Sequence, residues 1–198
     1  MITMINQIFI ISSAYLIGSL SFGIIISKFL KLRDPRTVGS KNPGATNVLR
    51  MGNKVAAIFT LLGDILKATI VVSIAIIMDL NELEIMQISL AVLLGHMYPI
   101  YYKFKGGKGV ATAFGILLAV NWILALIVIC IWLVTFSIWR YSSLAAIFAS
   151  LSVPIFSYIL DDQFFILTMN LIIATLIILR HHSNIKNLIA GKEPSFKN

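Results

Sequence analysis

Long apolar stretches separated by short polar segments dominate the chain. Six of them approach or exceed the ~18 residues that a helix needs to cross the hydrocarbon core of a bilayer. They cover residues 5–29, 55–78, 85–102, 110–139, 143–160 and 164–179. In total 59% of the residues are hydrophobic and 12% are charged, whereas soluble domains have roughly 25% charged residues. The pattern therefore predicts an all-α polytopic membrane protein with one domain, residues 1–198.

Charged residues between the apolar runs predict the topology. Basic clusters occupy residues 28–54, 103–108 and 180–197, and acidic residues occupy the loops at 79–84 and 161–162. The positive-inside rule places the basic clusters in the cytoplasm and the acidic loops outside. Of the 16 basic residues, Lys67 alone would then lie away from the cytoplasmic side.

This arrangement requires residues 110–139 to cross the membrane twice. Two crossings leave ~15 residues each, or ~22 Å, which is short for a ~30 Å core. The natural turn is Asn121-Trp122, a polar residue followed by an interfacial aromatic one. We expect about seven membrane helices, the fourth (residues 110–120) short or partly re-entrant, with the N-terminus outside and the C-terminus cytoplasmic.

The first cytoplasmic loop, residues 38–50, is rich in glycine, small hydroxyls, amides and cations. Such a segment can wrap closely around a phosphate and donate hydrogen bonds to it. The candidate ligands are Ser40, Asn42, Asn47 and Arg50. The same residue types also form ordinary turns, so composition leaves both interpretations open.

The second loop combines glycines with lysines directly before an apolar helix. A helix that begins after a glycine-rich turn offers unpaired N–H groups and the positive end of its dipole to an anion. The candidate ligands are Lys105, Gly106, Gly107, Lys108 and Gly109. The Walker A pattern is not met, so an NTPase has no support. The alternative is a basic loop that only fixes the topology.

The third segment, residues 180–194, carries a titratable group next to an amide. If the preceding helix continues, His181, Asn184 and Leu188 share one face. The adjacent His181 and His182 diverge on a helix, and no Cys, Asp or Glu has ligand spacing nearby. We therefore predict no metal site.

Asp64 and Lys67 lie inside the second apolar run at a spacing of one helical turn. Ionisable groups at membrane depth are costly and face a bundle interior or a cavity. A mutual ion pair that stabilises the fold is the favoured interpretation, and a wall of the active site is the alternative.

Together, residues 39–50, 63–67, 95–96, 104–112 and 181–185 closely resemble the motifs of one family. They resemble the bacterial acyl-phosphate:glycerol-3-phosphate acyltransferases, in motif order and over nearly the whole chain. The resemblance implies a multi-pass enzyme of the bacterial cytoplasmic (inner) membrane whose three motifs meet over a groove at the cytoplasmic face. It implies acyl transfer from acyl phosphate to glycerol 3-phosphate, which gives 1-acyl-glycerol 3-phosphate (lysophosphatidic acid) and phosphate in the first acylation of phospholipid biosynthesis.

The resemblance also implies partners and site residues. The partners are the two substrates, membrane lipid and the enzyme that makes acyl phosphate; no nucleic acid, metal or other cofactor is expected. We expect His181, Asn184 and Ser40 to be catalytic. The residues that bind substrate would be the candidate ligands in the first and second loops. Further residues would lie around the site and support it: Asp64, Lys67, His96 and Glu193.

An acyl phosphate is already activated, so the protein need only hold two phosphates, align the hydroxyl and stabilise the oxyanion. His181 has the side chain whose ordinary pKa suits a general base near neutrality, and a substrate phosphate oxygen is the alternative base. No acid completes a triad with His181, so direct attack is favoured over an acyl-Ser40 intermediate.

Two rival functions fit parts of the pattern. A transporter or channel for a phosphate-containing anion would also use a basic vestibule with re-entrant helices. However, the polar motifs lie on one face and not at mid-membrane. A noncatalytic scaffold that binds anionic lipids would leave the dense glycine, serine and asparagine motif unexplained.

Overall fold

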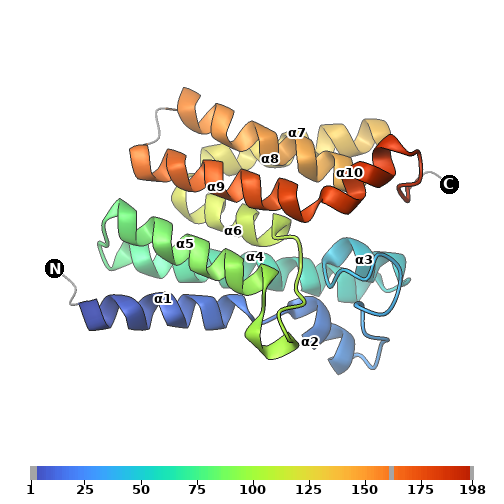
Figure 1. Ribbon diagram of the computed structural model, residues 1–198, viewed down its shortest axis with the longest axis horizontal. Coiled ribbons are helices and arrows are strands. Elements are labelled where there is room, and N and C mark those ends of the chain that lie inside the picture. The colour runs from blue at the N-terminus through green and yellow to red at the C-terminus, as the bar shows by residue number, and fades with distance from the viewer. Residues whose placement is uncertain (1–3, 161–162, 197–198) are drawn as a thin grey trace. The chain divides into compact units, whose positions relative to one another are not determined.

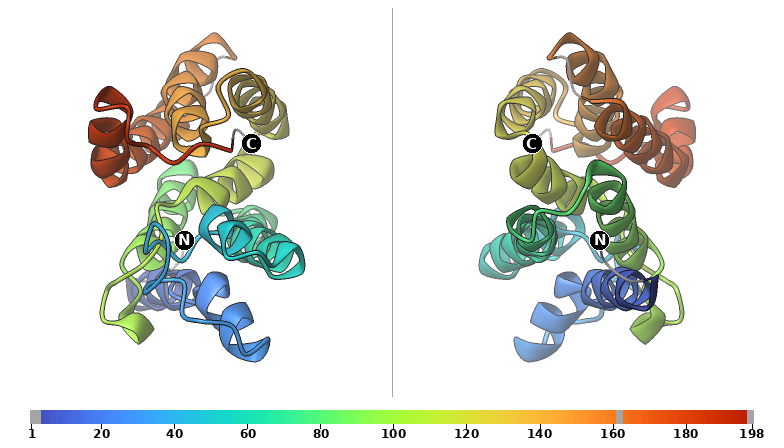
Figure 2. Two further views of the ribbon diagram at one scale, coloured as in Figure 1. Left: turned by 90° about the vertical axis from the view of Figure 1, so that its right-hand side faces the viewer. Right: turned by 90° about the vertical axis from the view of Figure 1, so that its left-hand side faces the viewer.

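The computed structural model describes residues 4–160 and 163–196, and all regular structure in that part of the chain is helical. The chain forms two compact units, Met1–Val120 and Asn121–Asn198, which we describe separately. The predicted all-α fold is confirmed. Figure 1 shows the helices along their length, and Figure 2 shows them end on.

The first unit consists of three long helices that run side by side, with shorter helices around them (Figures 1 and 2). The long helices are α1 (Met4–Gly18), α4 (Lys54–Ile77) and α5 (Glu82–Met97); the shorter ones are α2 (Phe22–Phe29), α3 (Ala45–Arg50), the 3-10 turn η1 (Ile100–Tyr102) and α6 (Val110–Val120).

Small residues allow α1 and α5 to approach closely. Ala14 and Ala91 lie in one buried cluster. A side chain at Gly18 would overlap the backbone of Val92, and one at Gly95 would overlap the carbonyl of Tyr15. Such small-residue contacts are typical of helices that associate in membranes, where close packing replaces the hydrophobic effect as the driving force.

Asparagine residues define where α4 and α5 begin. The side chain of Asn53 accepts a hydrogen bond from the Ala56 N–H at 2.8 Å. Asn81 and Glu84 form a capping box, in which each side chain bonds the other's backbone N–H. These caps satisfy N–H groups that a helix leaves unpaired at its start.

The first apolar run, predicted as one helix, is broken. α1 and α2 meet at an angle of 46°. Ser19 and Ser21 flank the break, and the hydroxyl of Ser19 donates to the carbonyl of Tyr15 at 2.9 Å. A serine that bonds back to the preceding turn competes with the helical ladder, and this favours a bend.

The second unit contains α7 (Trp122–Trp139), α8 (Ser142–Ile159), α9 (Phe164–Arg180) and α10 (His182–Ile189). The side chain of Asn121 caps α7 by accepting from Leu124 N–H at 3.1 Å, so the predicted turn at Asn121-Trp122 is confirmed. Ser157 and Asn170 join α8 to α9 through a buried hydrogen bond of 2.9 Å.

The chain does not continue as one straight helix through His181. α9 ends at Arg180 and α10 begins at His182, with an angle of 57° between them. His181 therefore sits at a corner between the two helices and is the N-cap residue of α10. The apolar pattern ends near this point, but it does not indicate the direction in which the chain turns.

Four helical segments of the described residues are long and apolar enough to span a membrane: α4, Glu82–Tyr102, α7 and α8. The bent pairs α1–α2 and α9–α10 also qualify if each pair counts as one span. α6 has 11 residues, or about 17 Å at 1.5 Å per residue, so the predicted short fourth segment is confirmed. The count of seven and the orientation of the termini stay predictions, and residues 161–162 and Lys197, used to predict the orientation, lie outside the described residues.

Candidate active site

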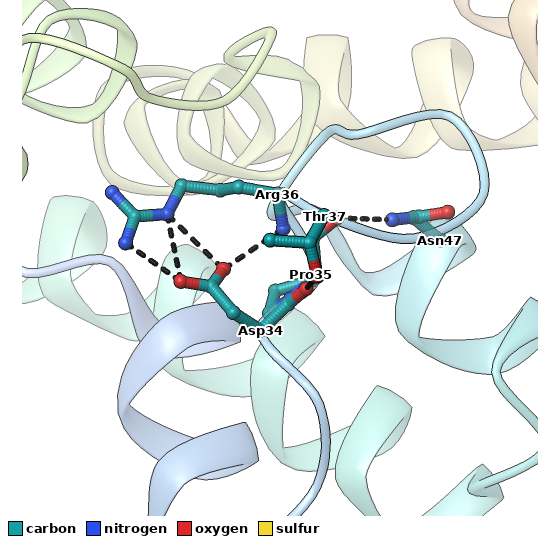
Figure 3. Close-up of polar contacts among 5 residues, drawn as sticks. All are labelled: Asp34, Pro35, Arg36, Thr37 and Asn47. Carbon is teal, nitrogen blue, oxygen red and sulfur yellow. Dashed lines mark hydrogen bonds and ion pairs between the residues drawn. The ribbon is translucent and has the colours of Figure 1, made fainter.

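Asn47 holds the first loop together (Figure 3). This buried side chain belongs to α3, and its Nδ2 donates to the carbonyls of Pro35 at 2.8 Å and Val38 at 3.0 Å. Its Oδ1 accepts from the backbone N–H of Ser40 at 3.0 Å. Both donors and one acceptor position of the amide thus have backbone partners. Asn47 determines the position of Ser40.

The turn before Ser40 has a backbone that favours glycine. Gly39 has a φ of 59°, and a side chain there would overlap the Asn47 amide oxygen. Ser40 itself is exposed, whereas Asn42 and Arg50 are half-buried. The loop therefore presents the Ser40 hydroxyl at the surface of the first unit on a fixed turn.

Asp34 and Arg36 form an ion pair just before this loop (Figure 3). The Arg36 guanidinium donates to both carboxylate oxygens of Asp34, at 2.7 to 3.1 Å. It also lies over the ring of Tyr102, with its carbon 5.6 Å from the ring centroid. The loop is thus linked to η1, and the Arg36 hydrogen bond holds the pKa of Asp34 below its usual value. The ion pair therefore stabilises the fold fully at pH values above the ordinary pKa of an aspartate. This stabilisation is lost as the pH falls through the lowered pKa of Asp34.

The second loop packs tightly against the end of α5. The Gly107 N–H donates to the carbonyl of His96 at 3.1 Å. A side chain at Gly106 would overlap the carbonyls of His96 and Met97, and one at Gly109 would overlap Met97 and Leu93. The glycines therefore let this loop follow the end of α5 closely.

The loop leads directly into α6, as predicted, because α6 begins at Val110. Lys105 is exposed and Lys108 is half-buried. The first N–H groups of a helix point outward and its dipole favours negative charge. This loop can therefore bind an anion such as a phosphate.

Asp64 and Lys67 form the predicted ion pair on α4, with Nζ 2.8 Å from Oδ1. Nζ also lies 2.7 Å from the carbonyl oxygen of Leu20 and 3.0 Å from Nδ1 of His96. All three charged or titratable side chains are buried. The ion pair is thus part of a larger network that includes the α1–α2 break and α5.

His181 is buried at the corner between α9 and α10, in the second unit. Its Nδ1 lies 2.8 Å from the carbonyl oxygen of Ile177. A carbonyl can only accept, so Nδ1 carries the proton. In the neutral ring the lone pair is then on Nε2, the arrangement that a general base needs.

Glu193 orients Asn184 in the same unit. Oε1 of Glu193 accepts from Nδ2 of Asn184 at 2.7 Å and from the hydroxyl of Ser143 at 2.6 Å. Because a carboxylate accepts and does not donate, the NH₂ group of Asn184 faces Glu193 and its Oδ1 faces elsewhere. Asn184 and Glu193, both on the predicted list, are joined directly.

Sequence reasoning missed several supporting residues. Ser143 is 50 positions from Glu193 along the chain, and no local pattern links the two. Arg36 and Tyr102 are similarly distant, although the Asp34-Pro35-Arg36 turn is visible in the sequence.

The structure places the first two motifs in one unit and the third in the other, and a common groove stays a prediction. In the part of the chain that the structure describes, no group of three His, Cys, Asp or Glu residues can hold a metal ion.

The helical fold, with several apolar helices long enough to cross a membrane, is that of a polytopic membrane protein. The glycerol-3-phosphate acyltransferase family pattern matches residues 8–191. The glycerol-3-phosphate acyltransferase of Methylobacillus flagellatus is 49% identical over 96% of this chain and 97% of its own. That of Neisseria meningitidis is 47% identical over 92% and 94%.

Solved structures agree. The crystal structure of PlsY (YgiH), an integral membrane glycerol 3-phosphate acyltransferase, in its glycerol 3-phosphate form has a TM-score of 0.93 and 41% identity, covering 97% of this chain and 96% of that one. The lysophosphatidic acid form has a TM-score of 0.90 and 40% identity, and it also covers 97% of this chain and 96% of its own. The chain belongs to the glycerol-3-phosphate acyltransferase family. It is an integral membrane acyltransferase, and the resemblance seen in its motifs is confirmed.

Proposed function

We propose that this enzyme transfers an acyl group from acyl phosphate to glycerol 3-phosphate. The products are lysophosphatidic acid and inorganic phosphate, and the reaction is the first acylation of phospholipid biosynthesis. The observation that carries the proposal is the glycine-rich, lysine-flanked loop that opens into α6, in the same unit as the Ser40 loop. The names of the solved relatives, which include glycerol 3-phosphate and lysophosphatidic acid forms, support it.

The loop at residues 105–109 binds the phosphate of glycerol 3-phosphate. Lys105 and Lys108 supply charge, and Gly106 and Gly107 let the loop between them lie closely against the end of α5. Charge-assisted hydrogen bonds to phosphate are about twice as strong as neutral ones. The start of α6 adds the favourable end of a helix dipole.

Ser40, Asn42 and Arg50 bind the acyl phosphate. Its bridging oxygen departs with the phosphate, so the donor needs no further activation. Donors aimed at the carbonyl oxygen stabilise the charge that develops as the hydroxyl attacks. The exposed Ser40 hydroxyl and the Arg50 guanidinium have the required chemistry. Asn47 acts by fixing the Ser40 turn.

His181 and Asn184 act on the attacking hydroxyl. Nε2 of His181 accepts the hydrogen bond of this hydroxyl and takes its proton as the oxygen bonds to the acyl carbon, while Asn184 orients the glycerol beside it. The phosphate that leaves the donor is the alternative base. The acyl carbon passes directly to the glycerol oxygen, because His181 bonds a backbone carbonyl at Nδ1, the nitrogen that an acid would bond in a triad.

The enzyme works at the cytoplasmic face of a bacterial inner membrane. Glycerol 3-phosphate arrives from water and the acyl chain from the bilayer, which suits motifs at the ends of apolar helices. The basic loops would also contact the enzyme that makes acyl phosphate, and the reaction as written needs no cofactor.

Incubation of the purified protein with acyl phosphate and glycerol 3-phosphate tests the proposal. We expect lysophosphatidic acid and inorganic phosphate to appear in equal amounts, and no lysophosphatidic acid without the acceptor. A protein that forms no product, but moves labelled glycerol 3-phosphate into vesicles, would be a transporter and would contradict the proposal.

A further inference from the structure

A buried lysine joins three elements of the first unit. Nζ of Lys67 lies 2.7 Å from the Leu20 carbonyl oxygen, 2.8 Å from Oδ1 of Asp64 and 3.0 Å from Nδ1 of His96. An ammonium group has three N–H donors and accepts nothing. Three donors and three partners match one to one.

The same contacts hold the ring of His96. Its Nδ1 lies 3.0 Å from Nζ of Lys67 and 3.4 Å from Oδ1 of Asp64. The imidazole is therefore held in a fixed orientation by the buried ion pair.

The far edge of the same ring lies against the phosphate loop. A side chain on Gly107 would meet Nε2, Cε1 and Cδ2 of His96, with Nε2 the nearest atom. The Gly107 N–H donates to the backbone carbonyl of His96 at 3.1 Å. Gly107 is thus held by His96 through both its ring and its backbone.

We propose that Lys67 is a positioning residue for the phosphate loop and acts through His96. Asp64 fixes the ammonium group, the ammonium group fixes the imidazole, and the imidazole forms the support on which Gly107 lies. The Leu20 bond ties this support to the α1–α2 break. This inference rests on the proposed function only where it concerns glycerol 3-phosphate, because the loop's position can also be measured without turnover.

Hydrogen exchange measures the loop directly. Replacing both charges in Asp64→Leu/Lys67→Met avoids an unpaired buried charge. We expect amide exchange at residues 105–109 to speed up about tenfold, whereas α8 stays unchanged. The matched control, Gln7→Leu/Gln87→Leu, removes a 2.8 Å hydrogen bond between α1 and α5 outside the network. Unchanged exchange at the loop in the first variant would overturn the proposal.

Kinetics then test whether Lys67 acts through His96. We expect Asp64→Leu/Lys67→Met to raise KM for glycerol 3-phosphate by about tenfold or more, and the KM for acyl phosphate by less than about twofold. His96→Ala should raise this KM by a similar factor. A triple variant that combines all three substitutions should have a KM no higher than that of the more severely affected of Asp64→Leu/Lys67→Met and His96→Ala. Effects that multiply would show that the two residues act independently, and would overturn the proposal.

Substitutions at Gly107 and His96 form a second double-mutant cycle, which leaves the ion pair of Asp64 and Lys67 intact. The backbone φ of Gly107 is outside the left-handed region, so an alanine there would not strain the backbone. Its Cβ would instead clash with the His96 ring. Gly107→Ala should raise KM for glycerol 3-phosphate about tenfold, but less than about twofold on a His96→Ala background. Equal effects on both backgrounds would contradict the proposal. A wild type that makes no lysophosphatidic acid would refute the proposed function, and the exchange experiment would still decide the role of Lys67.

Discussion

Nδ1 of His181 lies 2.8 Å from the carbonyl oxygen of Ile177, one helical turn earlier on α9. The contact places the proton on Nδ1 and leaves Nε2 as the nitrogen that can accept one. It also holds the ring at the corner between α9 and α10. In the proposed mechanism, this contact prepares the histidine for proton transfer.

His181→Ala should therefore lower kcat by about 10² to 10⁴, the usual contribution of a general base, with little change in KM. Steady-state kinetics check this. His182→Ala is the matched control, because His182 is exposed and its Nδ1 contacts the carbonyl of Leu179 at 3.1 Å. A kcat for His181→Ala near that of the wild type would indicate that a substrate phosphate takes the proton.

Lys108 should act mainly in binding. If it contacts the phosphate of glycerol 3-phosphate in both ground and transition states, Lys108→Ala raises KM for that substrate by roughly ten- to a hundredfold and changes kcat little. Lys54→Ala, at an exposed lysine at the start of α4, is the control and should leave both constants unchanged. A pure loss of kcat would contradict the assignment.

Glu193 should support Asn184 without reacting. Glu193→Ala leaves the buried amide of Asn184 and the hydroxyl of Ser143 without their acceptor. At about 1 to 3 kcal/mol for each, this lowers the free energy of unfolding by about 2 kcal/mol or more. Glu193→Gln keeps an oxygen that can accept both bonds and should retain most of the stability. Thermal unfolding in detergent compares them, and equal losses in the two variants would count against this role.

Single cysteines test the predicted topology. In a Cys130→Ser background, which removes the natural cysteine, cysteines at Ser40, Lys105 and Ser195 should react from the cytoplasmic side, and one at Asn81 from the outside. All four positions are exposed or lie in loops. Labelling of Lys105 and Ser195 from opposite sides would contradict the arrangement of about seven helices.

The sequence predicts those features that depend on local pattern. The split at Asn121 followed from helix length and charge, and the asparagine indeed caps α7. The start of α6 after Gly109 and the ion pair of Asp64 with Lys67 also follow from short-range spacing. Each of these signals lies within a few residues.

Features that depend on distant partners could not be predicted. The bend at residues 19–21 interrupts an apolar run whose pattern continues, and its carbonyl at Leu20 bonds Lys67, 47 positions away. His96 joins the ion pair from 29 positions away. The 57° corner at His181 likewise lies where the sequence left open whether the helix continues. Neither the direction of a helix bend nor a long-range hydrogen bond is encoded in local periodicity.

A comparison of two acyl donors tests whether this enzyme uses acyl phosphate. Purified protein in lipid or detergent would receive glycerol 3-phosphate together with either acyl phosphate or the corresponding acyl thioester, and lysophosphatidic acid would be measured. We expect rapid product formation with acyl phosphate and essentially none with the thioester, because the proposed donor site consists of groups suited to binding phosphate. Equal or faster turnover of the thioester would contradict it.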